Sequence, residues 1–253
     1  MSETSATPQT LPQLTTSDIY TVRILLSSFL PVELIDIILD EADYWSHSRV
    51  EASMCRKDYG LDDGTDYGEI FLFTMPLAHP DTVDHQVASK ISIKRGEHPC
   101  RRIVFELHSR DKGWSDYPEQ HGTYDRTRSW FDVSIDDPHG FIFAFGLLPP
   151  SAPADSATNR TVEAISDRDL QRNVHAKAGD TRHVIVWDWK DTIKDGSPEA
   201  LEAERMGGGW RSMDGEFVRG MKDGDQIALW MNAIEQGWVC RVSRAIVTIY
   251  WAV

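Results

Sequence analysis

Residues 101–131 constrain the fold of this chain more than any other stretch. They begin as a strand, because Ile103, Phe105 and Leu107 alternate with Val104, Glu106 and His108 at the period of two that half-buried strands show. The stretch then becomes a loop that mixes turn residues with large aromatic ones, and it returns to strand at residues 129–131. Turn residues fix the backbone, whereas aromatic residues anchor a loop to a core or meet a ligand. We therefore expect a β-rich fold with one functional loop.

The same alternation recurs along most of the chain. Short alternating segments separated by Gly, Pro and Asp turns predict strands at residues 69–74, 88–94, 101–109, 129–135, 141–147, 170–176, 183–189, 216–219, 226–233 and 244–252. Residues 199–205 predict a short helical turn. We predict a mainly β fold: an antiparallel β-sandwich of the jelly-roll, galactose-binding-like type over residues 68–253, preceded by a short helical pair.

The N-terminal part differs from the rest in its periodicity. Residues 1–16 are rich in Ser, Thr, Pro and Gln and predict a disordered tail. Residues 17–58 form the predicted helical segment, in which Asp18 helps to cap a first helix and Pro31 starts a second. Two short amphipathic helices cannot bury their apolar side chains against each other alone. They must dock on the rest of the chain or on a partner.

Charge and cysteine content limit the environment and the partners. The formal net charge of −14 argues against nucleic acid and against anionic membrane surfaces, since both need a basic face. Three widely spaced cysteines are typical of reduced thiols rather than of a disulfide framework. The polar N-terminus shows no secretory signal, and no apolar run approaches the ~20 residues of a membrane span. These features predict an intracellular protein, cytoplasmic or nuclear.

Catalytic and metal-binding motifs are weak in this sequence. His108, Asp111 and His121 could converge on a metal, but no closely spaced histidine pair supports a metal site. Cys55 or Cys240 could pair with a histidine as a nucleophile, although no local motif flanks either cysteine. The P-loop, dinucleotide and nucleophile-elbow motifs are missing. We therefore predict no catalytic residue, metal or cofactor.

The aromatic loop is the better candidate for a binding site. Sugars bind by stacking their apolar faces on aromatic rings while carboxylates take the hydroxyl groups. The alternative for each loop aromatic is that it anchors the loop in the core, which is what we expect of Trp130 in its strand. The predicted ligand-binding residues lie in this loop or in the turn before the last strand: Asp111, Trp114, Asp116, Tyr117, Tyr124 and Trp238.

Residues 29–39, FLPVELIDIIL, carry the first resemblance to a known family. They resemble the opening of an F-box, a small helical module whose first half reads roughly LPxELhxxIh and which docks the Skp1 adaptor of ubiquitin ligases. This resemblance implies a Skp1-type partner bound through Leu30, Pro31, Leu34 and Ile38.

Nearly the whole chain also resembles a family of fungal proteins that carries no established activity. The shared blocks stand here at residues 42–45, 110–131, 170–173, 215–219 and 224–251. The C-terminal end is in addition weakly similar to plant phloem lectins and to the sugar-binding domains attached to some F-box proteins, which are β-sandwiches. Together the resemblances imply a non-enzymatic recognition module, an F-box-like adaptor whose sandwich binds a protein or glycan ligand. The alternative is a small-molecule enzyme, possibly metal-dependent, with its site inside the sandwich.

Overall fold

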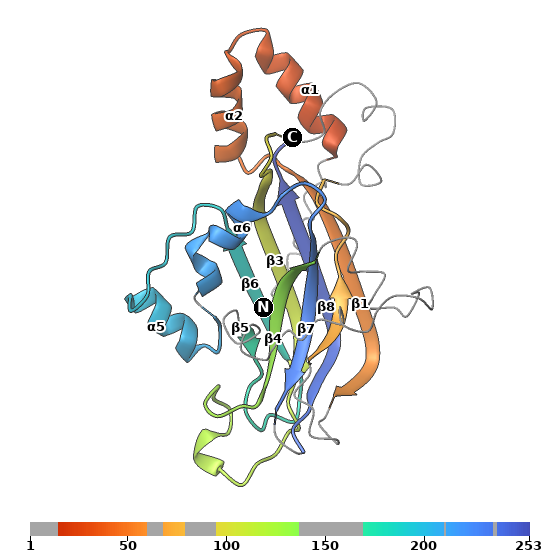
Figure 1. Cartoon of the computed structure of the whole chain (residues 1–253), viewed down its shortest axis with the longest axis vertical. Helices are drawn as coiled ribbons and strands as arrows, with labels where there is room; N and C mark the ends of the chain where they lie inside the picture. Colours follow the sequence, from red (N-terminus) through yellow and green to blue (C-terminus); the bar gives the residue numbers. More distant parts are fainter. Residues whose placement is uncertain (1–14, 60–67, 79–94, 137–168, 210, 235–236) are drawn as a thin grey trace, which may run out of the picture.

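A computed structural model describes residues 15–59, 68–78, 95–136, 169–209, 211–234 and 237–253 (Figure 1). The described chain is mainly β, as predicted, and its strands form two four-stranded antiparallel sheets. A few helices accompany the sheets. The strands predicted at residues 88–94 and 141–147, and residues 1–14 of the predicted tail, lie outside the described residues.

The first sheet contains the cleanest strands of the sequence. Its order is β1 (Ser46–Tyr59), β8 (Cys240–Trp251), β3 (Cys100–Arg110) and β6 (Thr181–Asp188). The register places Phe105 of β3 opposite Val247 of β8, and Ile103 opposite Ile249. These four side chains are buried because they share the inner face that the alternation predicts.

The second sheet completes the core. Its order is β2 (Glu69–Phe73), β7 (Gln226–Ala233), β4 (Ser129–Asp136) and β5 (Asp169–Arg172). Phe131 of β4 and Leu229 of β7 belong to the same buried cluster as Phe105 and Trp187 of the first sheet. The rings of Phe105 and Trp187 meet edge to face with centroids 4.9 Å apart, a favourable aromatic geometry. The core therefore draws on both sheets.

Two short helices interrupt the strands near the C-terminal half. Helix α5 (Pro198–Arg205) confirms the helical turn predicted at residues 199–205, and the Ser197 side chain caps it. Helix α6 (Glu216–Gly220) replaces the strand predicted at residues 216–219, so that prediction is wrong. Phe217 and Val218 of α6 are buried in the core. Two apolar residues between charged ones fit one turn of helix as well as a short strand, so periodicity alone does not separate the two.

The N-terminal helices are α1 (Thr16–Ser27) and α2 (Val32–Glu41). Thr15 caps α1: its hydroxyl accepts a hydrogen bond from the Asp18 backbone N–H, and the Asp18 carboxylate accepts one from the Thr15 N–H. Pro31 precedes α2 in extended conformation, as suits the start of a helix.

The predicted helical segment over residues 17–58 needs a correction. The helices end at Glu41, and β1 (Ser46–Tyr59) is an edge strand that pairs with β8 from Ser46 to Tyr59. The alternation of β1 is weak because few large apolar residues occur in SHSRVEASMCRKDY. An edge strand needs fewer buried side chains than a central one.

The two ends of the sheets carry different structures. Figure 1 shows α1 and α2 at one end, and the segment between β3 and β4, with the 3-10 helix η2 (Pro118–Gln120), at the opposite end. A second 3-10 helix, η6 (Arg211–Asp214), precedes α6. None of the described helices has the length and apolar character that crossing a membrane requires.

Candidate functional site

The loop end is the group of segments opposite the helical pair: residues 111–128 between β3 and β4, residues 173–180 between β5 and β6, and residues 237–239 before β8. Asp111 ties the first two segments together, because its carboxylate accepts the N–H groups of Gly113 and Ala176, each at 2.7 Å. The side chain is fully buried, and burial raises the pKa of Asp111. Its expected role in ligand binding is thus corrected: Asp111 fastens the loops.

Three of the predicted ligand-binding residues lie on the surface of the loop end. Trp114 is 60% exposed and Tyr117 is 51% exposed. Asp116, between them in sequence, is also exposed. Large aromatic side chains that remain in solvent are candidates for contact with a ligand.

Trp238 takes a supporting position beneath this surface. It is only 7% exposed, and its ring meets the His175 ring edge to face with centroids 5.3 Å apart. The Lys112 ammonium lies 4.2 Å from the Trp238 ring centroid and 4.5 Å from that of Trp114. Such cation–π contacts connect the exposed indole to the buried one through the lysine. Sequence reasoning did not identify Lys112.

Tyr124 anchors the loop instead of projecting from it. Its hydroxyl lies 3.0 Å from Nε2 of His183 on β6. A Cβ atom on Gly207 would stand 2.3 Å from Cδ1 of Tyr124, so the ring lies directly against that backbone. Burial raises the pKa of Tyr124 and, helped by the charge of Lys177, lowers that of His183 to about 4. Both shifts follow from loss of water around the charged forms.

Ser115 is the centre of a hydrogen-bond network in the loop end. Its Oγ lies 2.7 Å from Nε2 of His175 and 3.0 Å from Nε2 of His121, and it accepts the Tyr117 N–H at 3.2 Å. On the far side of the imidazole, Nδ1 of His175 lies 2.8 Å from the carbonyl oxygen of Asp125. The network thus links the Ser115 hydroxyl, the His175 imidazole and the Asp125 carbonyl in series.

The carbonyl oxygens assign the tautomers of both imidazoles. A carbonyl only accepts, so Nδ1 of His175 carries the proton that is donated to Asp125, and Nε2 of the neutral ring accepts from the Ser115 hydroxyl. His121 Nε2 lies 3.1 Å from the carbonyl oxygen of Ser115, so this nitrogen carries a proton. Its N–H donates both to that carbonyl oxygen and to the Ser115 Oγ. The Ser115 oxygen thus receives two donors while its own proton points at His175. A hydroxyl beside a base in this arrangement is chemically competent as a nucleophile.

No sequence signal predicts this network. Ser115 stands in Trp-Ser-Asp, which matches no nucleophile motif, and His175 follows it by 60 residues. Only the contact between the loops after β3 and after β5 brings them together, as when the Gly122 N–H donates to the His175 carbonyl at 2.9 Å. Tertiary contacts of this kind leave no local pattern.

The structure separates the residues that could have held a metal. His108 lies on β3 with Nε2 2.9 Å from the Glu106 carboxylate, whereas His121 belongs to the loop end. His121 and His175 come together, with ring centroids 6.1 Å apart. Within the described ranges, no group of three or more His, Cys, Asp and Glu side chains is arranged for a metal ion.

Cys240 is not placed for nucleophilic chemistry. It is fully buried, and burial raises the pKa of its thiol to about 12. Its Sγ accepts a hydrogen bond from Asn173 Nδ2 at 3.3 Å. A buried protonated thiol is inert, since the thiolate is the reactive form. The side chain of Cys55 lies outside the described residues.

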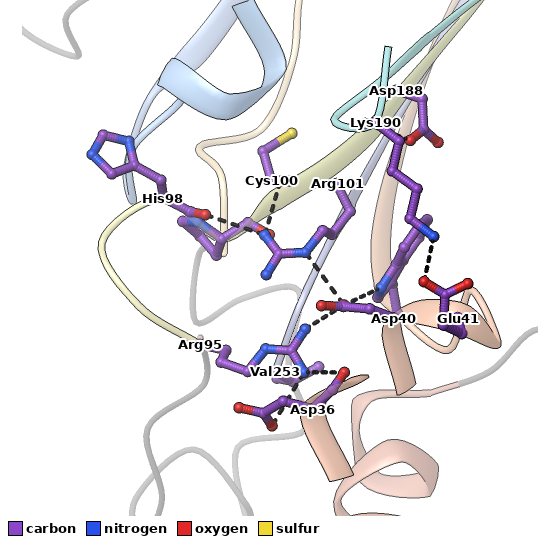
Figure 2. Close-up of polar contacts among 12 residues, drawn as sticks. Asp36, Asp40, Glu41, Arg95, His98, Cys100, Arg101, Asp188, Lys190 and Val253 are labelled. Atoms are coloured by element: carbon purple, nitrogen blue, oxygen red, sulfur yellow. Dashed lines mark hydrogen bonds and ion pairs between the residues drawn. The ribbon is translucent and has the colours of Figure 1, made fainter. Parts of the chain in front are cut away.

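The helical pair is held to the sheets by charged side chains on its inner face. Figure 2 shows Arg95, from the segment before β3, and Arg101, at the start of β3, directed at Asp40 of α2. Asp40 also accepts the Trp45 indole N–H at 2.9 Å. Asp36, one turn earlier, pairs with Arg23 of α1 at 2.9 Å and with Arg95 at 3.2 Å. The ion pairs thus join both helices to the body of the protein.

Apolar contacts on the inner face are few. Ile19 and Tyr20 of α1 form a small buried cluster with the C-terminal Val253, and Tyr44 packs against it. Ile35 and Leu39 are the buried residues of α2. The helical pair therefore docks on the sheets through a mixed surface of buried apolar side chains and ion pairs.

The outer face of the helical pair is apolar. Two of the predicted partner-binding residues, Leu34 and Ile38, are 47% and 43% exposed, Pro31 is exposed, and Leu30 is half-buried. Other exposed apolar side chains on this pair are Ile24, Leu25, Phe29, Val32 and Ile37. A soluble helix normally confines its apolar residues to one inner stripe, and in α2 Ile35 and Leu39 already form that stripe.

No protein-family model matches the chain, and no curated protein matches it. Function is therefore inferred from the residues and their geometry.

Proposed function

We propose that the protein is a recognition module of the F-box-like adaptor type. The helical pair binds a Skp1-type adaptor through its outer face, and the body, an antiparallel sandwich of the jelly-roll, galactose-binding-like type, presents a protein or glycan ligand at the loop end. The observation that carries the proposal is the exposed apolar face of α2. Leu34, Ile37 and Ile38 remain in solvent. The inner face of the same helix already buries Ile35 and Leu39.

Physical cost supports a docking role for this face. Each exposed apolar side chain forgoes about 1.5–3 kcal/mol that full burial would contribute. Several such side chains on one pair of helices indicate an interaction surface more often than an apolar patch without function. A helix that offers apolar residues at i, i+3 and i+4, as Leu34, Ile37 and Ile38 do, fits a partner that supplies an apolar groove.

The loop end supports the ligand half of the proposal. Trp114 and Tyr117 offer exposed rings on which a sugar or a partner side chain can stack, and Asp116 offers a carboxylate to hydroxyl groups. The wider resemblance to the fungal family, and an intracellular location, belong to the same proposal. The two binding surfaces lie at opposite ends (Figure 1), so a ligand and an adaptor can be held at once.

The docking half is tested by one substitution on α2. Ile38→Asp places a charge on the outer face, where Ile38 is 43% exposed, so we expect the fold to survive. Binding of a purified Skp1-type adaptor, measured by titration calorimetry, should weaken about tenfold or more, because a charge in an apolar interface stays unpaired. The melting temperature is measured on the same samples.

Leu201→Asp is the matched control. Leu201 is 60% exposed on α5, away from the helical pair, so the same chemical change there should leave adaptor binding intact. Both variants should stay within about 0.5 kcal/mol of the wild type in unfolding free energy. Absence of adaptor binding by the wild type, or equal loss in both variants, would reject the docking function.

A further inference from the structure

We propose that the loop end is also an acyl-transfer site, in which Ser115 is the nucleophile and His175 its general base. This inference goes beyond the recognition function and does not depend on its docking half, since the helical pair lies at the opposite end (Figure 1). It rests on the line of hydrogen bonds from Ser115 Oγ to His175 Nε2 at 2.7 Å, and from His175 Nδ1 to the Asp125 carbonyl at 2.8 Å. An activated nucleophile needs a base in contact and a third group that orients the base.

The base is rigidly placed. His175 is fully buried, its backbone N–H donates to the Thr123 carbonyl at 2.8 Å, and its ring meets Trp238 edge to face. The Asp125 carbonyl fixes the tautomer that leaves Nε2 free to take a proton. The distance of 2.7 Å lies within the range of about 2.6–3.2 Å that direct proton transfer requires.

The nucleophile is accessible and electrostatically supported. Ser115 is partly exposed, whereas its base is buried behind it. The Tyr117 N–H and the His121 Nε2–H both donate to the Ser115 oxygen, so they stabilise negative charge that develops there. In the proposed reaction one of these donors passes to the oxyanion of the tetrahedral intermediate, which frees a lone pair of the Ser115 oxygen for attack.

The surroundings indicate the substrate class. Trp114 and Tyr117 flank Ser115 and expose their rings, at 60% and 51%. The Lys112 ammonium lies against the Trp114 ring. We therefore assign an ester with a flat, apolar acyl group, which would stack on these rings while its carbonyl carbon lies over Ser115.

The reaction is balanced by water. The Ser115 oxygen attacks the acyl carbon as its proton passes to His175 Nε2, and the tetrahedral intermediate expels the alkoxide, which leaves as alcohol with that proton. Water then attacks the acyl-serine, gives one proton to His175 Nε2 and releases the acid as the proton returns to the Ser115 oxygen. The sum is ester plus water to acid plus alcohol, and His175 ends in its starting form.

A fluorophosphonate ester tests the site without knowledge of the natural substrate. Attack of the Ser115 oxygen on phosphorus forms an O–P bond, expels fluoride and leaves a stable adduct that intact mass spectrometry detects. We expect one adduct per native chain, mapped to Ser115 by peptide sequencing. The native chain should react at least about a hundredfold faster than the urea-unfolded chain, because general-base assistance contributes roughly 10²–10⁴.

Two variants and a control identify the base. Ser115→Ala should abolish the adduct. His175→Asn keeps a donor near the position of Nδ1 but removes the basic Nε2, so labelling should slow by about a hundredfold or more. Ser53→Ala removes an exposed serine of β1 and should label like the wild type.

The comparison of labelling rates between native and unfolded chain needs no substitution. It therefore tests the nucleophile even where a variant does not fold. Equal labelling of native and unfolded chains, an adduct on another serine, or an unchanged rate in a folded His175→Asn variant would each overturn the assignment. Adaptor binding is read out separately, through Ile38→Asp. A failure here therefore leaves the docking function standing.

Discussion

The helical end and the loop end of this protein expose apolar or aromatic side chains and hold them in place with polar contacts beneath. At the helical end, Leu34 and Ile38 face solvent above the carboxylate of Asp40. At the loop end, Trp114 faces solvent above hydrogen bonds that centre on Ser115 and His175. Beneath these exposed groups both ends also bury apolar side chains, Ile35 and Leu39 at the helical end and Trp238 at the loop end.

The two ends differ in the chemistry of the inner contacts. The helical end uses formal charges: Arg95 and Arg101 converge on Asp40, and Arg23 on Asp36. The loop end uses imidazoles, hydroxyls and backbone groups, apart from Lys112 and the buried Asp111. Partly buried ion pairs are screened little by salt, whereas a buried neutral histidine is sensitive to acid. We therefore expect acid to loosen the loop end, through His183.

The largest effect is expected at Asp40. Asp40→Asn removes the charge but not the shape. It takes from Arg101 the carboxylate with which it pairs and leaves Arg95 with Asp36 alone; the side chains of Asp40, Arg95 and Arg101 are only 12–13% exposed. An uncompensated, mostly buried charge costs about 3–5 kcal/mol. The unfolding free energy from urea denaturation measures the loss.

Glu41→Gln is the control for Asp40 on the same helix. Glu41 pairs with Lys190 at 2.9 Å, but the side chains are 69% and 46% exposed, so the change should cost less than about 1 kcal/mol. If Asp40→Asn were as mild as Glu41→Gln, charges would not be what holds the helical pair to the body.

The next effect concerns acid and His183. Burial lowers the pKa of His183 to about 4, so the folded protein keeps this ring neutral, while the unfolded chain protonates it near the ordinary histidine pKa of 6.5. Stability from this group is fully present above pH 6.5 and is lost as the pH falls toward 4, because the unfolded state then binds the extra proton. At ~1.4 kcal/mol per pKa unit, the loss amounts to about 3 kcal/mol at most.

The His183→Gln variant isolates the contribution of His183 to the loss of stability in acid. Its stability should change less than that of the wild type between pH 6.5 and 4, the range set by the two pKa values of His183. Urea midpoints at a series of pH values give the difference, in which the carboxylates common to both proteins cancel. Parallel curves for the two proteins would show that the loop end does not owe its acid sensitivity to His183.

The sheets were predictable where burial imposes a period of two. In β8, Val247, Ile249 and Trp251 face the core as the alternation required. β1 escaped prediction because an edge strand such as Ser46–Tyr59 has few buried side chains to mark it. The sequence predicts a strand at residues 216–219, where α6 stands. Phe217 and Val218 can be buried in the core from one helical turn as well as from a strand.

The candidate site was predictable only in its exposed part. Trp114 and Tyr117 stand in a loop rich in turn residues, and an aromatic residue in such a loop is a visible signal. Asp111 shows the same signal but faces inward, since the sequence does not say which turn carboxylates bind backbone N–H groups. The pairing of Ser115 with His175 depends on two loops meeting, and no spacing rule encodes that contact.

Of the three sites tested, Asp40, His183 and Trp114, the smallest effect on stability is expected at Trp114. Its size shows whether the aromatic loop binds a ligand or anchors itself in the core. A buried tryptophan truncated to alanine costs about 3–5 kcal/mol, but Trp114 is 60% exposed and its described ring contact is with the flexible Lys112 side chain, so Trp114→Ala should cost about 1 kcal/mol. Trp130→Ala is the comparison, because Trp130 lies in β4 beside the fully buried Phe131 and should cost more. Denaturation midpoints of both variants measure the difference. A Trp114→Ala variant less stable than Trp130→Ala would make the loop aromatic a core plug, and the loop end would then lose the surface on which both its ligand and its ester substrate are proposed to stack.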